Sequence, residues 1–321
     1  MILLATNDVG PACYLLALDN YIDDSAWVVS DLTKILLSNN KCITDWSKAK
    51  PSLIVTGTSL GDSLDKNLIT FAKNINKPSV SIIEHWSWYK KRFELDGEMI
   101  LPDHIIVNDE YAKEQAIADN LSENKIFIGG NPYLEKLSKM RLPTIDTEAW
   151  EKNNNVESDN IILFITESLK NSFPADSSDY LGYDEFEVLN DIIEILPEST
   201  ALLIKTHPEE ENEKYNSYQS NRVRIFQKMS LEQMIQVPDM IIGMASMLLI
   251  ELAMFRDDII SYRPNARKAF IGEKIGATHY VKSKSQLKNY IFDPPILSSM
   301  PFRKKYEGSG KRISKFLHSL I

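Results

Sequence analysis

Short apolar runs alternate with longer segments in which apolar residues recur at helical spacing. In the first half of the chain the runs are "ILLAT", "SLIVTG", "SVSIIEHW", "HIIVND" and "IFIGG", at residues 2–6, 52–57, 79–86, 104–109 and 126–130. Continuous apolar runs are typical of strands buried on both faces, and the segments between them have the period of a helix. Strands that alternate with helices predict a parallel sheet covered on both faces.

The same rhythm restarts after a polar interruption. Residues 141–160, "RLPTIDTEAWEKNNNVESDN", have the composition of a linker or surface loop. Beyond them come "IILFIT", "ALLIKT", "VRIF", "MIIGM" and "DIISY", at residues 161–166, 201–206, 223–226, 240–244 and 258–262. Two such units predict an α/β protein with two Rossmann-like, doubly wound domains facing a cleft. We divide the chain into a domain at 1–140, a linker at 141–160, a domain at 161–302 and a tail at 303–321.

Composition narrows the functional classes. The hydrophobic share of 43% and the charged share of 25% are those of a soluble globular protein. A net charge of −9 disfavours non-specific binding to nucleic acid. Cys13 and Cys42 have no metal-ligand spacing and form no disulfide framework, which fits a reducing compartment. The first residues lack a basic leader, and the apolar stretch at 240–255 is too short for a membrane span, so we expect a cytoplasmic protein.

Candidate binding residues follow two strands of the second domain, where ligands of doubly wound folds bind. His207 and Pro208 come directly after "ALLIK", and an imidazole there can hydrogen-bond a phosphate or ribose group. The turn "GMASM" consists mainly of small residues and leads into a helix. The N-terminal N–H groups and the dipole of that helix attract anions. Together they predict a phosphate-bearing ligand, bound by Lys205, His207, Pro208, Gly243, Ser246 and Met247. The plain alternatives are a strand end at Pro208 and a helix cap at Ser246.

These motifs resemble those of the GT-B glycosyltransferases, which have two Rossmann-like domains and use nucleotide-activated sugars. "IFIGGNPYLEKL" (126–137) is similar to the segment that ends the N-terminal domain in lipid A disaccharide synthase and the peptidoglycan N-acetylglucosaminyltransferase. "KTHPEEENEKY" resembles the HP motif of bacterial sialyltransferases, capsule Kdo transferases and CDP-glycerol-type polymerases. "GMASMLLIELAMF" resembles their Ser-containing motif. The resemblance implies that His207 contacts a cytidine nucleotide and that the helix after Ser246 holds the donor phosphate.

The resemblance also implies that the first domain supplies the general base and the acceptor site. In "IIEHWSWYKKRF" (82–93), Glu84 and His85 are candidate bases, and in extended backbone only one of them points into the cleft. Trp88 can stack on a sugar and Arg92 can bind an anionic acceptor. The alternatives are core packing for the aromatic residues and a solvated face for the basic ones.

Two further loops complete the predicted rim. Asp8 and Gly10, in "TNDVGPA", are expected to line the acceptor site, unless Asp8 is only a helix cap. Asp62, in "TGTSLGDSLD", is another candidate base, and this loop lacks the lysine of a P-loop and the spacing of a dinucleotide fingerprint. Arg263 can add positive charge near the leaving phosphate, although a surface arginine is the default interpretation.

No metal site is predicted. The histidines, at positions 85, 104, 207, 279 and 318, are scattered, and no DxD motif lies in a loop. "LPDH" and "VPDM" place Asp103 and Asp239 in turns before strands, and we assign them no chemistry. The GT-B resemblance likewise implies no cofactor beyond a nucleotide-sugar co-substrate.

The tail at 303–321 is basic and carries an apolar stripe at helical spacing, formed by Ile313, Phe316, Leu317 and Leu320. In GT-B enzymes the last helix commonly packs back on the N-terminal domain, which suits this stripe. The charges at 303–305 and 311–315 leave open a peripheral contact with the inner face of an anionic membrane that carries a lipid-linked acceptor.

Three functions remain open. The first is a glycosyltransferase that moves a sugar from a CMP- or other NDP-sugar to a surface-polysaccharide or glycolipid acceptor. The second is a UDP-sugar 2-epimerase or hydrolase on the same fold, a family that carries a similar "GN" segment at Gly130–Asn131. The third is a non-catalytic sugar-nucleotide-binding protein. An epimerase converts its nucleotide sugar without an acceptor, a transferase needs one, and a binding protein does neither.

Overall fold

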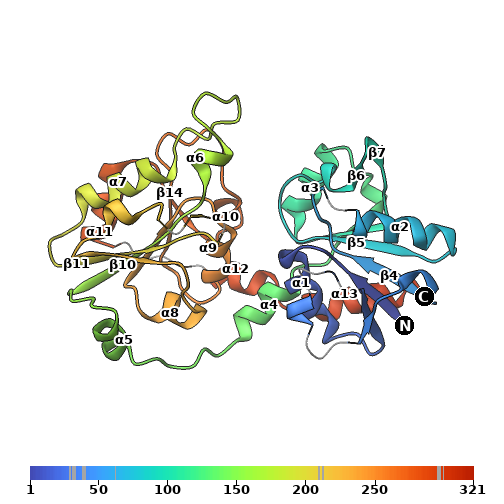
Figure 1. Ribbon diagram of the computed structural model, residues 1–321. Helices are drawn as coiled ribbons and strands as arrows, with labels where there is room; N and C mark the ends of the chain where they lie inside the picture. Colours follow the sequence, from blue (N-terminus) through green and yellow to red (C-terminus); the bar gives the residue numbers. More distant parts are fainter. Residues whose placement is uncertain are drawn as a thin grey trace. The chain divides into compact units, whose positions relative to one another are not determined.

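The computed structural model describes residues 1–28, 30, 34–37, 41–61, 63–208, 210–211, 213–294, 298 and 300–321. The chain forms two compact units (Figure 1). Unit 1 comprises Met1–Lys136 and Lys305–Ile321, and unit 2 comprises Leu137–Lys304. The chain therefore passes between the units twice.

Unit 1 is built on a parallel sheet with the strand order β3-β2-β1-β4-β5-β8-β9. Its strands are β1 (Ile2–Ala5), β2 (Ser25–Val28), β3 (Cys42–Ile43), β4 (Leu53–Thr56), β5 (Ser79–Ile83), β8 (His104–Val107) and β9 (Ile126–Ile128). A small hairpin pairs β6 (Glu94–Leu95) with β7 (Glu98–Met99). The helices are α1 (Val9–Asp19), α2 (Leu64–Asn74), α3 (Glu110–Ala118) and α13 (Ser309–His318). A further helix, α4 (Pro132–Lys139), begins in unit 1 and ends in unit 2.

The strands of unit 1 are continuously apolar because both faces of the sheet are covered. Leu4 and Val55 point to a core that includes α1 and α13, whereas Leu3 and Ile54 point to the core formed with α2. Side chains alternate between the faces of a strand, so each strand needs apolar residues at every position. This packing explains the unbroken apolar runs in the sequence.

Unit 2 is a second parallel sheet, with the strand order β12-β11-β10-β13-β14-β15. Its strands are β10 (Asn160–Ile165), β11 (Thr200–Lys205), β12 (Val223–Phe226), β13 (Met240–Gly243), β14 (Ile259–Tyr262) and β15 (His279–Val281). The helices are α5 (Thr147–Asn153), α6 (Leu169–Ser172), α7 (Glu185–Ile195), α8 (Leu231–Gln236), α9 (Met247–Leu252), α10 (Ile271–Lys274), α11 (Lys284–Phe292) and α12 (Met300–Lys305). The predicted α/β class with two Rossmann-like domains is confirmed.

Single 3-10 turns occur in both units. They lie at Lys34–Leu36, Trp46–Lys48, Lys91–Phe93, Glu123–Lys125 and Asn216–Tyr218.

The polar segment at 141–160 is not simply a linker. It contains α5, and Trp150 of this helix packs on Phe226 of β12 with ring centroids 5.4 Å apart. Val156 is buried as well. The segment is therefore part of unit 2, and its "NNN" run ends a helix instead of forming an open loop.

The tail returns to unit 1, where Ile313 and Leu317 of α13 are buried in the core beside Tyr14 and Leu18 of α1. Ser314 also donates a hydrogen bond from Oγ to the carbonyl of Tyr21, at 2.7 Å. In Figure 1 the last helix, in red, lies beside the blue α1 from the start of the chain.

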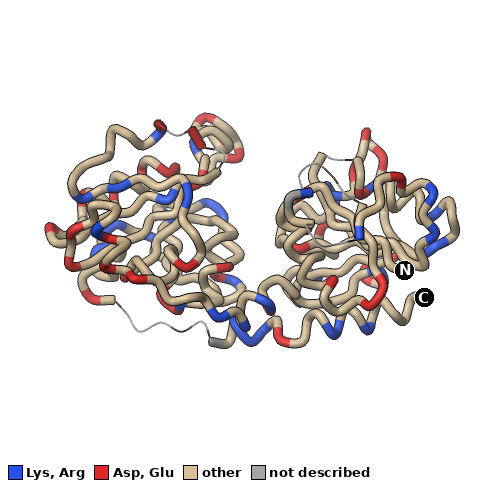
Figure 2. Tube along the Cα trace, turned by 60° about the horizontal axis from the view of Figure 1, so that its bottom comes forward, with Lys and Arg blue, Asp and Glu red and all other residues tan. Residues whose placement is uncertain are grey.

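Several basic residues of the tail have partners within their own unit. Lys305 pairs with Asp109 at 3.1 Å, and Arg303 pairs with Asp257 at 2.9 Å. Acidic and basic positions are intermixed along both units (Figure 2). No helix in the described part of the chain is both long and apolar enough to cross a bilayer.

Asp103 and Asp239 have equivalent structural roles in the two units. The Asp103 carboxylate accepts a hydrogen bond from the N–H of Ser79 at the start of β5, at 2.9 Å. The Asp239 carboxylate accepts one from the N–H of Ile161 near the start of β10, at 2.7 Å. Each carboxylate links two neighbouring parallel strands by a hydrogen bond, which is a structural role.

Candidate functional site

The carboxyl ends of β1, β4 and β5 form the first candidate region, because the chain order of unit 1 reverses between β1 and β4. The loops after these two strands are in direct contact. A methyl group on Gly57 would lie 2.4 Å from Thr6 Oγ1 and 2.5 Å from Pro11 Cβ, so only glycine fits. This packing places the loop after β4 against the start of α1.

Glu84, directly after β5, is the most chemically distinctive residue of unit 1. Its side chain is 16% exposed, and its Oε1 lies 3.9 Å from Arg92 Nη1. A methyl group on Gly10 would lie 3.4 Å from the same oxygen. Burial raises the pKa of Glu84 to about 7, the Arg92 charge opposes the rise, and the Asp8 charge adds to it. The structure thus brings Glu84, Asp8 and Gly10 close together, and their role at a ligand site stays a prediction.

The second oxygen of Glu84, Oε2, is buried and has no hydrogen-bond partner among the described residues. Buried carboxylate oxygens are normally paired, and exceptions are frequent at functional sites. A carboxyl group that titrates near neutral pH can both accept and return a proton. Glu84 therefore has the properties of a general acid–base residue.

His85 differs from its neighbour in its charge state. Its Nδ1 is hydrogen-bonded to Ser87 Oγ at 2.9 Å. Burial lowers the pKa of His85 to about 4, and the Arg92 charge contributes in the same direction, so the imidazole is neutral at pH 7. Between the two candidate bases, Glu84 is the one whose protonation changes near neutral pH. The third, Asp62, lies outside the described residues.

Arg92 is not a solvated acceptor-binding residue. It is only 6% exposed and joins two loops, donating from Nη1 to the Thr58 carbonyl at 2.8 Å and from Nε to the Ser87 carbonyl at 3.1 Å. Its guanidinium is committed to bracing the site, which corrects the predicted acceptor contact. Trp88, by contrast, is 53% exposed, with Lys91 Nζ 4.8 Å from the ring centre. Its ring is available for stacking.

Ser59 is a candidate that the sequence did not single out. Its N–H donates to Asp65 Oδ2 at 2.8 Å, and its carbonyl accepts from Lys66 Nζ at 2.5 Å. Both partners are buried in the first turn of α2. The Ser59 hydroxyl itself is buried without a partner among the described residues. The Ser- and Thr-rich composition of the loop indicated a binding site. The sequence did not indicate that two buried charged side chains hold the loop in place.

The carboxyl ends of β10, β11 and β13 form the second candidate region, in unit 2. Glu167 follows β10, and its Oε2 accepts a hydrogen bond from the N–H of Ala245 at 2.7 Å, which ties it to the turn after β13. Burial raises the pKa of Glu167 to about 7, opposed by this hydrogen bond and by the Arg263 charge. Glu167 was also not predicted; its position at a strand end was the available signal.

The turn "GMASM" lies at the strand end as predicted, but it is tightly packed. A methyl group on Gly243 would come within 2.8 Å of Leu249 Cδ2. Ser246 caps α9, accepting a hydrogen bond from the N–H of Leu248 at 3.3 Å. The cap alternative for Ser246 is therefore what the structure contains, and Met247 begins the helix half-buried.

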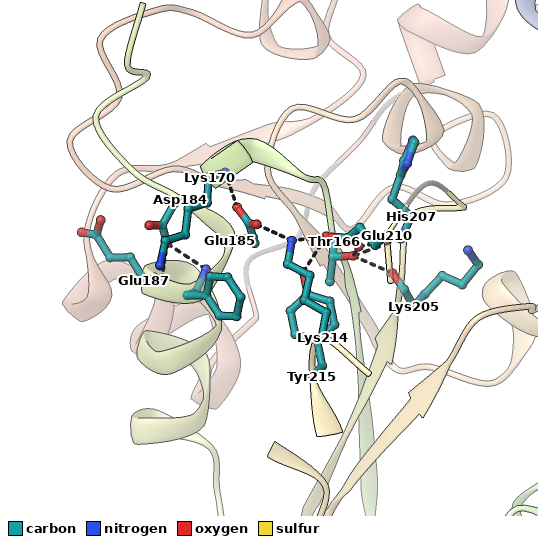
Figure 3. Close-up of polar contacts among 11 residues, drawn as sticks. Thr166, Lys170, Asp184, Glu185, Glu187, Lys205, His207, Glu210, Lys214 and Tyr215 are labelled. Carbon is teal, nitrogen blue, oxygen red and sulfur yellow. Dashed lines mark hydrogen bonds and ion pairs between the residues drawn. The ribbon is translucent and has the colours of Figure 1, made fainter. Parts of the chain in front are cut away.

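His207 and Lys205 lie at the end of β11 (Figure 3). The His207 side chain is half-buried and points away from the polar cluster around Glu210, and Pro208 beside it is exposed. Lys205 is buried, its Nζ donates to the Thr206 carbonyl at 2.7 Å, and burial lowers its pKa.

Arg263 is not the surface residue expected by default. It is 2% exposed and forms an ion pair with Glu273. It also donates to Ser261 Oγ at 2.9 Å and to the Lys268 carbonyl at 2.8 Å, and its guanidinium lies 4.6 Å from the ring centre of Tyr280. The burial of this guanidinium overturns the default interpretation of a surface arginine, and the contact with a leaving phosphate stays a prediction.

In the described part of the chain, His, Cys, Asp and Glu side chains form no group of three or more that could hold a metal ion.

The comparisons with known proteins identify the fold. Neither a protein-family model nor a curated protein sequence matches this chain. Solved structures match over its full length. The UDP-GlcNAc 2-epimerase of Methanocaldococcus jannaschii is 15% identical over 99% of both chains, with a TM-score of 0.67. Staphylococcus aureus MnaA, solved with UDP, is 13% identical over 100% of this chain and 97% of its own, with a TM-score of 0.67.

A third match is Anabaena Alr3699/HepE in complex with UDP, which is 11% identical over 99% of both chains with a TM-score of 0.67. The chain has a GT-B-like fold. At these identities the likeness establishes the fold alone. The predicted kinship with the HP-motif transferases has no support from a sequence match.

Proposed function

We propose that the protein is an enzyme that binds a uridine-nucleotide sugar and acts on it with Glu84 as its acid–base residue. The observation that carries the proposal is the buried carboxyl group of Glu84, with an unpartnered oxygen and a pKa of about 7, at the carboxyl end of β5. Uridine replaces the cytidine of the sequence-based prediction because structures that match over the whole chain hold UDP or UDP-GlcNAc. The case for cytidine rests on a short motif.

We propose 2-epimerisation or hydrolysis of the UDP-sugar as the reaction, since UDP-GlcNAc 2-epimerases recur among the structural matches. Epimerisation removes the proton from carbon 2 as UDP leaves carbon 1, which forms a double bond between these carbons. UDP then adds back to carbon 1 while a proton is delivered to the opposite face of carbon 2. Hydrolysis deprotonates a water molecule that adds to carbon 1 as UDP leaves. Both need a base that is partly ionised near pH 7, and Glu84 meets this requirement. His85, neutral and held by Ser87, is suited to donate a hydrogen bond to the sugar.

In this proposal the nucleotide binds at the carboxyl edge of unit 2. His207 contacts the ribose or phosphate, Pro208 and Met247 border the ligand, and the small residues Gly243 and Ser246 let it approach the backbone. The buried Lys205 contributes positive charge from behind the loop. Asp8, Gly10 and Ser59 of unit 1 remain candidate ligand contacts beside Glu84.

A glycosyltransferase is the second candidate, and the exposed ring of Trp88 favours it. An aromatic side chain with half its surface exposed, four residues after the proposed base, is suited to stack on an acceptor sugar. In that reaction Glu84 deprotonates the acceptor hydroxyl while UDP leaves. A match to HepE solved with UDP-glucose, at a TM-score of 0.60, makes UDP-glucose a donor to test.

The test is an NMR assay in D2O with UDP-GlcNAc and with UDP-glucose, first without an acceptor. An epimerase yields a second UDP-sugar with deuterium at carbon 2, and a hydrolase yields UDP and free sugar. A transferase binds the UDP-sugar but converts it only when an acceptor glycan is added. Glu84→Gln should reduce conversion at least about 100-fold. Glu167→Gln, which changes the other carboxyl with a pKa near 7, should retain far more activity. Failure of UDP and both UDP-sugars to bind would refute the proposal.

A further inference from the structure

A cluster of buried polar side chains lies beneath the loop that carries His207 (Figure 3). We call Thr166, Glu185, Glu210, Lys214 and Tyr215 the Glu210 cluster. All except Lys214 are fully or almost fully buried, and the Lys214 side chain is 12% exposed. The cluster contains Glu210, the second of three glutamates that follow the His-Pro pair. An acidic residue is unexpected there, next to a site for an anionic ligand.

Glu210 accepts four hydrogen bonds, two on each carboxylate oxygen. Oε1 accepts from Lys214 Nζ and from the Tyr215 hydroxyl, both at 2.7 Å. Oε2 accepts from the N–H of His207 at 2.8 Å and from the Thr166 hydroxyl. Burial alone would raise the pKa of Glu210, but the hydrogen bonds from Lys214, Thr166 and Tyr215 outweigh it and leave the pKa below its ordinary value. The carboxylate is therefore charged and saturated.

Lys214 neutralises the charge that Glu210 brings into the interior. Its ammonium group lies between Glu210 and Glu185, and it pairs with both. Glu185 is anchored in turn, because its other oxygen accepts a hydrogen bond from the N–H of Lys170 at 2.8 Å. One ammonium group between two carboxylates leaves the cluster with one net negative charge. The pairing with Lys214 weakens, but does not remove, the repulsion between Glu210 and an anion on the outer side of the loop.

The cluster decides which groups of the His207 loop can meet a ligand. The main-chain N–H of His207 donates to Glu210, and that of Glu210 donates to the His207 carbonyl at 3.0 Å. Pro208 has no N–H group. The main-chain donors at these three positions are thus used internally or absent, and the imidazole of His207 points away from the cluster (Figure 3).

We infer that Glu210 is the positioning residue of His207: by holding the His207 N–H and Thr166, it fixes the loop in the conformation that presents the imidazole to the nucleotide. This inference rests on the proposed function for the nucleotide contact itself. In this inference Glu210, two residues after Pro208, is an internal anchor of the loop.

The test compares Glu210→Gln with Glu185→Gln. Both variants remove one charge from the same cluster, but only Glu210 touches the His207 loop. A glutamine at 210 has one acceptor atom instead of two, so the His207 N–H or Lys214 loses its partner. Hydrogen exchange of the His207 amide and the affinity for UDP by calorimetry are measured in each.

We expect Glu210→Gln to speed exchange of the His207 amide at least about tenfold and to weaken UDP binding about tenfold, in line with loss of a charged hydrogen bond. Adding His207→Ala to Glu210→Gln should weaken UDP binding by less than about a further twofold, because both changes remove the same contact. Glu185→Gln should leave both readouts within about twofold of the unaltered protein. Thr166→Val, a milder change in the same contact, should show the same pattern if Glu210→Gln does not fold.

Three outcomes would overturn the inference: equal effects of Glu185→Gln and Glu210→Gln on UDP affinity, additive effects of Glu210→Gln and His207→Ala, or unchanged amide exchange. If the unaltered protein does not bind UDP, the proposed function fails. The exchange rate of the His207 amide then still decides whether Glu210 fixes the loop.

Discussion

Replacing Glu84 with glutamine should stabilise unit 1, although it should slow the reaction. In the folded protein the pKa of Glu84 is about 7, against an ordinary value of 4.5. A carboxyl group whose pKa is raised by folding destabilises the folded state as pH rises from the unfolded pKa through the folded one. The cost is small below pH 4.5 and complete above pH 7. Glutamine does not ionise, so the variant lacks this pH-dependent destabilisation.

The magnitude follows from the pKa difference. The free energy of unfolding of Glu84→Gln should exceed that of the unaltered protein by about 3 kcal/mol at pH 8 and by less than about 1 kcal/mol at pH 5. These values are upper limits, because the variant also loses the contact with Arg92. With a urea dependence of about 2 kcal/mol per molar, the unfolding midpoint of Glu84→Gln should rise by about 1 M at pH 8, and by less than half of that at pH 5.

Tryptophan fluorescence is a suitable assay because unit 1 holds four of the five tryptophans, namely Trp27, Trp46, Trp86 and Trp88. The exposed Glu94 of the same unit provides the control, and Glu94→Gln should show no comparable gain at pH 8. A Glu84→Gln midpoint that is unchanged at pH 8, or raised equally at both pH values, would refute the reasoning.

Two further variants test the site and the tail. Ser59→Ala removes a buried hydroxyl without a partner among the described residues. We expect its stability in thermal melting to stay within about 0.5 kcal/mol of the unaltered protein, and its UDP-sugar turnover to be about tenfold slower. A large loss of stability with full activity would contradict this. Ile313→Ala empties a buried position between α13 and the sheet and should cost about 3 kcal/mol in urea unfolding of unit 1. The exposed Ile321→Ala is its control, and equal effects of the two would exclude a packing role for α13.

The fold was largely predictable because burial on both faces leaves a plain pattern in the sequence. Each long strand of both sheets coincides with an apolar run. The missed strands are β2, β3, β6, β7 and β15. Apart from β2, they are two or three residues long and partly exposed, so they lack an unbroken apolar run. β2 was missed although Ala26, Trp27 and Val28 are buried. The polar segment before β10 hid α5 because its few apolar residues are separated by charged and amide residues.

The site was predictable only in part. The sequence placed Glu84 and His207 after the ends of β5 and β11, because the carboxyl edge of a parallel sheet can be predicted from the apolar runs. The exposure of Arg92 and Arg263 was misjudged, since the burial of a charged side chain depends on partners supplied by distant loops. The role of Glu210 was hidden for the same reason: its partner Thr166 comes from another strand end.

The division of unit 1 into two stretches of sequence has a consequence for biosynthesis. Unit 2 is complete once Lys304 has been added, whereas unit 1 lacks α13 until the final residues are made. During translation the first stretch must wait with the surface that Ile313 and Leu317 later cover still open to solvent. The sequence of unit 2 is therefore complete before that of unit 1, although it begins second.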